Sequence, residues 1–269
     1  MLAYPQIKPY LFKIGPLQVR WYGLMYLIGF VLSYLIVQRE MKRRKTGIKP
    51  ENVENLYVYL ILSLVLGARF GYVLFYNLQW YINNPWSVFA VWQGGMSFHG
   101  GLVGCLTGAY LFCRARKLDF VVVSDIVALT VPIGLALGRL GNFINGELYG
   151  RVSDVPWAMV FPAGGPMPRH PSQLYELLLE GVVSFVILWS LKDRIKKRGI
   201  TISLFVFLYG VFRFTVEFFR EPDPQLGLFF GLISMGQILS SIMVVAGLSG
   251  MLIFKSKKIY VPNSAKKII

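Results

Sequence analysis

Several ionisable side chains lie inside or beside long apolar segments, where an isolated charge is unfavourable. They are Arg69, His99, Asp125, Arg139, Glu176, Glu180, Arg213 and Glu217. A charge at the bilayer centre costs at least about 2.5–3.5 kcal/mol, so each group needs a partner or a purpose. Guanidinium groups match phosphate oxygens bidentately, and imidazole exchanges protons near neutral pH. Arginines in such positions suit a phospholipid headgroup, and a histidine beside them suits proton transfer.

The densest polar run begins at Arg139, in the sequence GRLGNFINGE. Asn142, Asn145 and Glu147 follow within eight residues of this arginine, next to an apolar segment, which favours a ligand-binding site over a single interfacial charge. Two simpler readings stay open. Arg139 can extend to the interface by itself, and Arg213 and Glu217, four residues apart, can form an intrahelical ion pair.

His99 lies in the sequence GGMSFHGG, where neighbouring glycines permit sharp turns and close approach of a ligand. The alternative is a hydrogen-bonded structural histidine. Among the aromatic residues we expect mostly interfacial and packing roles, but Tyr22 and Tyr209 lie near segment ends and can present a phenol to a headgroup. The chain has two histidines and no accompanying cysteine or carboxylate cluster, so we expect no metal site.

These groups must be positioned by membrane helices. Of the 269 residues, 55% are hydrophobic and 15% are charged, and the mean hydropathy is +0.54. A run of about 20 apolar residues is long enough to cross a bilayer as a helix. The sequence predicts an all-α polytopic membrane protein with about seven spans, at residues 21–37, 56–75, 97–112, 120–137, 174–191, 202–219 and 234–254.

The positions of the basic residues predict the topology. The net charge is +15, and most Lys and Arg follow the first, third, fifth and seventh apolar segments, as expected of cytoplasmic loops. We therefore expect the N-terminus outside, the C-terminus in the cytoplasm and no nucleic-acid partner. Residues 139–173 form a small polar periplasmic head segment, and residues 1–269 form one integral membrane domain.

Six motifs resemble the prolipoprotein diacylglyceryl transferases of the bacterial inner membrane. They occur in order along nearly the whole chain: WYGLMY (21–26), GARFGY (67–72), GGMSFHGG (94–101), GRLGNFINGELYG (138–150), RHPSQLYE (169–176) and YGVFRFTVEFFR (209–220). The resemblance implies transfer of an sn-1,2-diacylglyceryl group from phosphatidylglycerol to the lipobox cysteine thiol of a prolipoprotein signal peptide. A thioether forms, and glycerol phosphate leaves.

The resemblance also implies roles for individual residues. Arg139 and Arg213 would be essential and His99 important, and the substrate site would include Tyr22, Asn142, Glu147, Gly150 and Glu217. The ionisable and polar patterns above add Arg69, Asn145 and Tyr209 to that site. We expect a multi-pass inner-membrane monomer without a cofactor, whose partners are phosphatidylglycerol, the prolipoprotein and the surrounding lipid.

Two other functions fit parts of the pattern. A carrier or flippase for anionic lipid would also need buried arginines, but the polar groups here crowd one side of the predicted bundle, whereas alternating access exposes a site to both sides. An intramembrane hydrolase using Ser97 and His99 is disfavoured because the two lie in one glycine-rich turn without a nucleophile-elbow motif.

Overall fold

The computed structural model describes residues 2–5, 7–14, 17–221, 228–229 and 232–256, and it is mostly helical. Its contacts divide the described residues into two compact units. The first unit contains the residues up to Val37 and those from Ser124 onward. The second unit contains Gln38–Val123.

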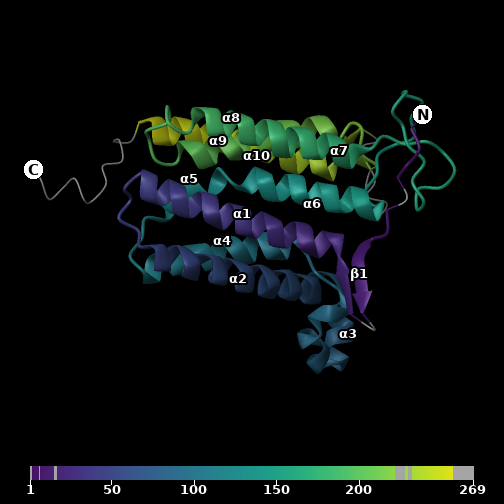
Figure 1. Ribbon diagram of the computed structural model, residues 1–269, viewed down its shortest axis with the longest axis horizontal. Helices are drawn as coiled ribbons and strands as arrows, with labels where there is room; N and C mark the ends of the chain where they lie inside the picture. Colours follow the sequence, from purple (N-terminus) through teal and green to yellow (C-terminus); the bar gives the residue numbers. More distant parts are fainter. Residues whose placement is uncertain (1, 6, 15–16, 222–227, 230–231, 257–269) are drawn as a thin grey trace, which may run out of the picture. The chain divides into compact units, whose positions relative to one another are not determined.

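The first unit contains the helices that carry most of the ionisable groups. Figure 1 shows α6, α8, α9 and α10 running alongside one another. The elements are β1 (Tyr10–Ile14), β2 (Leu17–Arg20), most of α1 (Trp21–Arg43), the end of α5 (Phe120–Ala128), α6 (Val131–Asn145), α7 (Ser172–Glu176), the π-helix η3 (Leu177–Val183), α8 (Ser184–Leu191), α9 (Ile200–Val216), β3 (Leu228–Phe229), β4 (Ile233–Ser234) and α10 (Met235–Lys255). Strands β1 and β2 pair antiparallel, as do β3 and β4.

The second unit is built on two helices that pack backbone to backbone. Its elements are the end of α1, α2 (Pro50–Tyr76), α3 (Leu78–Asn83), η1 (Pro85–Phe89), η2 (Val91–Gln93), α4 (Phe98–Ala115) and the start of α5. A Cβ at Gly104 would lie 2.2 Å from the Ser63 carbonyl oxygen, so only glycine permits this spacing of α2 and α4. Small residues such as glycine let two membrane helices approach this closely.

Helices occupy all seven segments predicted to span the membrane, but not all of them meet the requirements for a span. Four are long and apolar enough: α1, α2, the continuous run Ser172–Leu191 and α10. A fifth is formed if the bent pair α5 and α6 is counted as one span. The polytopic membrane character is therefore confirmed, whereas the count of seven spans stays a prediction.

Two local features differ from the sequence expectation. The fourth segment, predicted as one span, is bent by 46° between α5 and α6. Pro132 lies at the start of α6, where its missing N–H interrupts the hydrogen bonding of a continuous helix. The polar run predicted to leave the membrane at Arg139 continues as helix α6 to Asn145, so the long non-helical segment is 146–171.

That non-helical segment closes over the end of α6. Phe143, Met159 and Phe161 form a small buried core, and the Tyr4 hydroxyl donates a 2.7 Å hydrogen bond to the Phe143 carbonyl oxygen. Leu2 also donates its backbone N–H to the Ala158 carbonyl oxygen, at 3.1 Å. The N-terminal residues thus fix the head segment to the helix that carries Arg139.

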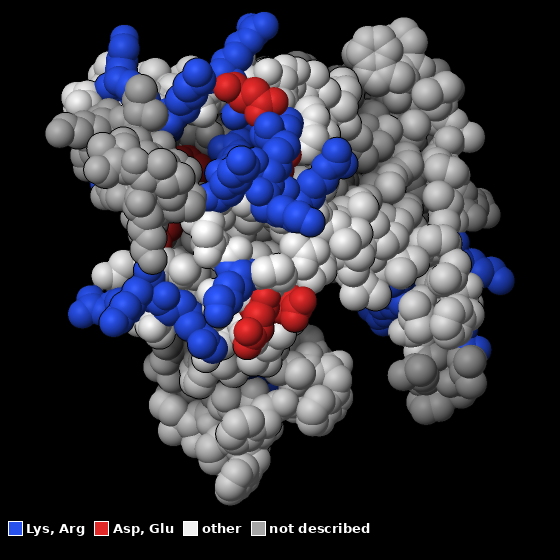
Figure 2. All heavy atoms as spheres, turned by 60° about the vertical axis from the view of Figure 1, so that its left-hand side comes forward, with Lys and Arg blue, Asp and Glu red and all other residues white. Residues whose placement is uncertain are grey.

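Basic side chains gather at helix ends within each unit, and few acidic side chains lie among them in the view of Figure 2. In the first unit, the connection from α8 to α9 contains Lys192, Arg194, Lys196, Lys197 and Arg198. In the second unit, the end of α1 and the end of α4 carry similar clusters. The distribution is the one that the positive-inside pattern predicts for cytoplasmic ends.

Candidate active site

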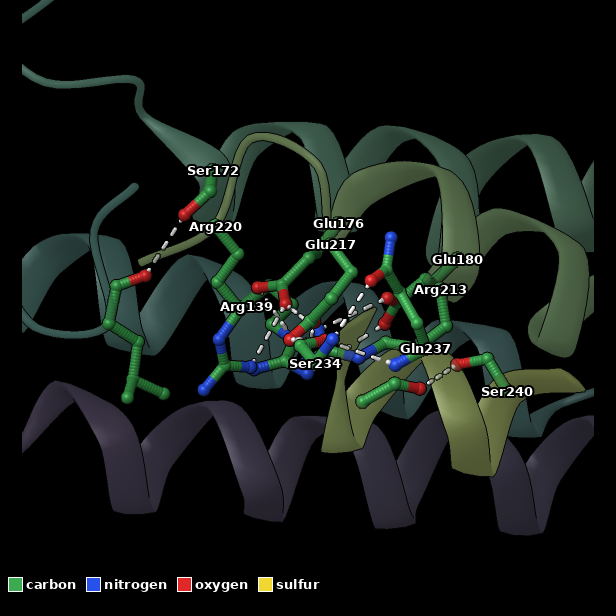
Figure 3. Close-up of polar contacts among 12 residues, drawn as sticks. Arg139, Ser172, Glu176, Glu180, Arg213, Glu217, Arg220, Ser234, Gln237 and Ser240 are labelled. Carbon is green, nitrogen blue, oxygen red and sulfur yellow. Dashed lines mark hydrogen bonds and ion pairs between the residues drawn. The ribbon is translucent and has the colours of Figure 1, made fainter. Parts of the chain in front are cut away.

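The strongest polar cluster of the first unit centres on one buried carboxylate. Glu176 is fully buried and forms ion pairs with three arginines from different parts of the chain, as Figure 3 shows. Its Oε2 lies 3.2 Å from Arg139 Nε, and its Oε1 pairs with Arg213 Nη1 and lies 3.5 Å from Arg220 Nη1. Arg139 and Arg213, predicted from sequence to share a site, are therefore brought together.

The cluster forms where three helical segments contact one another. Arg139 lies in the middle of α6, Glu176 near the start of the helical run Ser172–Leu191 and Arg213 in the last turn of α9. The π-helix η3 follows Glu176 directly and carries Glu180, whose carboxylate faces the same arginines. Turns of π-helix inside a longer helix occur frequently at functional sites.

Glu217 pairs with the guanidinium nitrogen of Arg213 that does not contact Glu176. Its Oε2 lies 2.7 Å from Arg213 Nη2, so the predicted pairing of these two residues is confirmed. The Ser234 hydroxyl donates to Glu217 Oε1 at 2.9 Å, and Ser234 and Gln237 form a capping box at the start of α10. A carboxylate at a helix N-terminus is favoured by the helix dipole, so α10 helps to position Arg213.

The charges of this cluster balance, but their accessibility differs. Three arginines face three glutamates. Glu176 and Glu180 are fully buried, whereas the side chains of Arg139 and Arg213 retain 17% and 13% of their accessible surface. The groups that remain accessible are therefore cationic, which suits an anionic ligand.

The polar run after Arg139 folds back on itself. Asn142 and Asn145 both donate their side-chain amides to Glu147 Oε1, at 2.9 and 3.1 Å. Tyr22 packs directly on α6, because a Cβ at Gly141 would lie 2.8 Å from the Tyr22 ring. The predicted residues Tyr22, Asn142, Asn145 and Glu147 thus lie along the part of α6 that follows Arg139.

Gly150 serves as a backbone junction in this structure. A Cβ there would lie 2.3 Å from the Phe219 carbonyl oxygen, and the Gly150 N–H donates to the His170 carbonyl oxygen at 2.8 Å. The next residue, Arg151, donates its N–H to Phe219. Gly150 therefore lets the head segment pair with the chain that leads into Arg220.

Tyr209 lies on α9 among the charged groups of the cluster. Glu180, Arg213, Arg139 and Glu176 are its electrostatic neighbours. Its expected contact with a lipid headgroup stays a prediction.

His170 lies at the entry to α7, outside the apolar helices. Its Nδ1 is 3.0 Å from the Tyr175 hydroxyl oxygen, and its ring packs edge-on against Phe219. Partial burial lowers the pKa of His170 below its ordinary value, because it disfavours the charged imidazolium. These contacts indicate a structural role for His170 where the head segment joins α7.

Arg69 lies in the second unit, and it is engaged differently from the other arginines. It is 4% exposed, and its guanidinium donates to five backbone carbonyl oxygens, those of Ser87, Val88, Ala90, Gly94 and Gly95. An arginine guanidinium has five N–H donors, so all of them are used. In this structure Arg69 holds the connection between α2 and α4, and its predicted contact with substrate stays a prediction.

His99 also lies in the second unit, in the first turn of α4. Its side chain is exposed, and its ring lies edge-on to Phe98 at a centroid distance of 5.6 Å. Ser97 caps this helix by accepting a hydrogen bond from the Gly100 N–H at 3.2 Å. The capped turn fixes the backbone that carries the imidazole, and the expected role of His99 with the arginines stays a prediction.

Comparisons with known proteins decide the family. Residues 9–253 match the family model of prolipoprotein diacylglyceryl transferase. This chain belongs to that family. Curated relatives named phosphatidylglycerol--prolipoprotein diacylglyceryl transferase occur in Geobacter sulfurreducens, at 50% identity over 96% of this chain and 99% of the relative. The relative in Bordetella parapertussis is 52% identical over 96% and 98%, and the one in Vibrio vulnificus is 54% identical over 92% of each chain.

These findings confirm the predicted family and show that the chain is a transferase. Sequence reasoning singled out Glu176 and Glu180 as ionisable groups without assigning them to the site, and it missed Arg220 and Ser234. Glu176 and Glu180 were recognisable as ionisable residues four apart in an apolar segment. Nothing in the sequence marked the long-range pairing of Glu176 with α6 and α9.

Proposed function

We propose that the arginine cluster is the site at which this enzyme transfers an sn-1,2-diacylglyceryl group from phosphatidylglycerol to a prolipoprotein. The acceptor is the thiol of the lipobox cysteine in the signal peptide. The observation that carries the proposal is the accessible pair Arg139 and Arg213, fixed on one buried carboxylate. The names of the curated relatives support the choice of donor and acceptor.

The two arginines bind the phosphate and stabilise its growing charge. The thiol sulfur attacks the glycerol carbon bonded to the phosphate oxygen, a carbon–sulfur bond forms and the carbon–oxygen bond breaks. The electron pair of that bond leaves with glycerol phosphate. Guanidinium groups aimed at developing negative charge in a water-poor site stabilise the transition state more than the bound substrate.

His99 is the proposed general base. A free cysteine has a pKa near 8.5, so only a minority is ionised at neutral pH, and an imidazole can accept the thiol proton directly or through water. The arginines could also promote ionisation of the thiol without His99. Transfer by His99→Gln compared with Arg139→Ala separates the two, because near-normal transfer by the histidine variant removes it as the base.

The other predicted residues line the donor site in this proposal. Tyr22, Asn142, Asn145 and Glu147 surround the end of α6, where they can contact the glycerol headgroup. Tyr209 and Glu217 flank Arg213 on α9. Gly150 acts through its backbone junction, and Arg69 acts by holding the connection between α2 and α4.

The proposed orientation places the site at the periplasmic side of the inner membrane. Arg213 lies near the end of α9, whereas the basic connection 192–199 precedes the start of the same helix. A 17-residue helix is about 25 Å long, so it separates the two by most of the roughly 30 Å hydrocarbon thickness. With seven spans, this puts the N-terminus outside and the C-terminus in the cytoplasm.

Both substrates carry hydrocarbon chains, so we propose lateral entry from the outer leaflet into a monomeric enzyme that needs no cofactor. Only glycerol phosphate has to leave through water. The segment 146–171 covers the end of α6 and is placed to border this route.

A purified-component assay tests the proposed function. The enzyme is incubated with phosphatidylglycerol and a synthetic lipobox peptide, and the peptide mass is measured. The expected result is the gain of one diacylglyceryl group on the cysteine, with no gain on a Cys→Ser peptide. No gain with phosphatidylglycerol, or the same gain with the serine peptide, would contradict the proposal.

A further inference from the structure

The arginine cluster contains two buried carboxylates that differ in how they meet the arginines. Glu176 lies 3.2 Å from Arg139 and 3.5 Å from Arg220 and accepts a hydrogen bond from Arg213. Glu180 lies 3.8 Å from Arg139 and 3.7 Å from Arg213, beyond hydrogen-bond distance. Neither oxygen of Glu180 has a hydrogen-bond partner, whereas Glu176 has one at Oε1 and none at Oε2. The two residues therefore supply the same charge, but Glu176 restrains the orientation of the arginines more closely than Glu180 does.

We propose that Glu176 is a positioning residue, which sets the relative orientation of Arg139, Arg213 and Arg220 for the transition state. This inference rests on the proposed function of the cluster. Each guanidinium comes from a different segment of the chain, and Glu176 is the one carboxylate in the described residues that lies within 3.5 Å of all three.

The local backbone explains why Glu176 can reach all three. Glu176 ends α7, and the chain continues at once into the π-helix η3. This π-helix packs tightly on α6, because a Cβ at Gly181 would lie 2.5 Å from the Ala136 Cβ. The close approach brings Glu176 within reach of Arg139. The short helix α7, which contains Glu176, also contacts α9, which carries Arg213.

The effect of Glu176 on chemistry should differ from its effect on binding. Replacing it by glutamine removes one negative charge, so the cluster gains net positive charge, and the affinity for an anionic headgroup is kept or increased. The three guanidiniums lose the carboxylate charge with which all of them pair, and their alignment with the leaving phosphate is then lost. Loss of an interaction that is made only in the transition state lowers kcat and leaves KM largely unchanged.

The experiment compares Glu176→Gln with Glu180→Gln in the full-length enzyme. Both substitutions are isosteric and remove the same charge from neighbouring positions. Steady-state kinetics with phosphatidylglycerol and a lipobox peptide give kcat and KM for each. We expect kcat to fall about 100-fold in Glu176→Gln, with KM unchanged or lowered, and to fall at least tenfold less in Glu180→Gln.

Glu40→Gln is the control for the loss of a buried carboxylate. Glu40 is 1% exposed and pairs with Arg43 and Arg44, but it lies outside the cluster. Its variant is expected to change the melting temperature of the purified protein without changing kcat. A melting-temperature change in Glu176→Gln comparable with that of Glu40→Gln, together with the loss of kcat, supports positioning.

Three results would overturn the proposal: equal kcat losses in both cluster variants, no loss in Glu176→Gln, or a loss confined to KM. If Glu176→Gln does not fold, Glu176→Asp keeps the charge and shortens the side chain. A fully active aspartate variant then counts against the proposal, and a loss of kcat supports it. Full activity of Arg139→Ala and Arg213→Ala would instead refute the proposed function itself.

Discussion

The two units hold their buried arginines with different partners. In the second unit, Arg69 gives all of its donors to neutral backbone carbonyls. In the first unit, Arg139 and Arg213 face carboxylates and remain partly accessible. Carbonyl partners fix a guanidinium completely, whereas carboxylates align it and leave donors for a ligand. The same residue type therefore stabilises a loop in one unit and forms a candidate active site in the other.

The largest expected effect is at Arg213. Arg213→Ala should lower the transfer rate about 10²–10³-fold, because one donor aimed at developing charge is lost. Arg213→Lys keeps the charge without the planar fork and should be intermediate. The measurement is transfer to a lipobox peptide by purified enzyme. Equal rates for lysine and wild type would show that charge alone is sufficient and would weaken the contrast with Arg69.

Gly181→Ala should have a smaller effect on the same cluster. The added methyl group forces η3 away from Ala136 on α6, which separates Glu176 from Arg139. We expect the transfer rate to fall about tenfold, by partial loss of the arginine alignment. Gly134→Ala, on the same helix as Ala136, is the matched control, since a Cβ at Gly134 meets no atom within 4 Å. Equal rates for the two variants would argue against tight packing as the cause.

Arg69→Lys tests the structural side of the comparison. Lysine cannot replace the five donors, so several carbonyl oxygens of the α2–α4 connection lose their partner. We expect the melting temperature to fall by about 5 °C or more, with a transfer rate that follows the folded fraction. A large loss of transfer at an unchanged melting temperature would place Arg69 in the substrate site, as the sequence analysis predicts.

The smallest expected effect concerns His170. Its pKa is lowered in the folded protein, so the unfolded chain binds a proton more readily as the pH falls through about 6.5. Stability is therefore full at neutral pH and declines toward the lowered pKa. His170→Gln should reduce the loss of melting temperature between pH 7.5 and pH 5.5. An identical loss in both proteins would contradict this assignment.

The sequence predicts the local features of the site well. The spacing of Arg213 and Glu217 predicts their ion pair, because helical periodicity alone places them on one face. The side chains of the polar run from Arg139 to Glu147 contact one another, and the ligand expected there stays a prediction. Apolar segment lengths place helices in every predicted segment, although Pro132 breaks the fourth one.

The long-range features could not be predicted from these patterns. Glu176 reaches Arg139 and Arg213 only because the start of the helical run Ser172–Leu191 packs beside the middle of α6 and the last turn of α9. Arg69 had the same sequence signature as Arg139, a cation in an apolar segment. Its different role depends on backbone carbonyls of the connection that follows α2. Every residue has a backbone carbonyl, so the residue types in the sequence do not reveal these contacts.

The most direct test of the central claim is the single-turnover transfer rate of the double variant Arg139→Gln, Arg213→Gln at saturating phosphatidylglycerol. If these arginines stabilise the departing phosphate, the rate should fall at least about 10³-fold while the melting temperature shows a folded protein. A folded double variant that transfers the diacylglyceryl group within threefold of the wild-type rate would contradict the account.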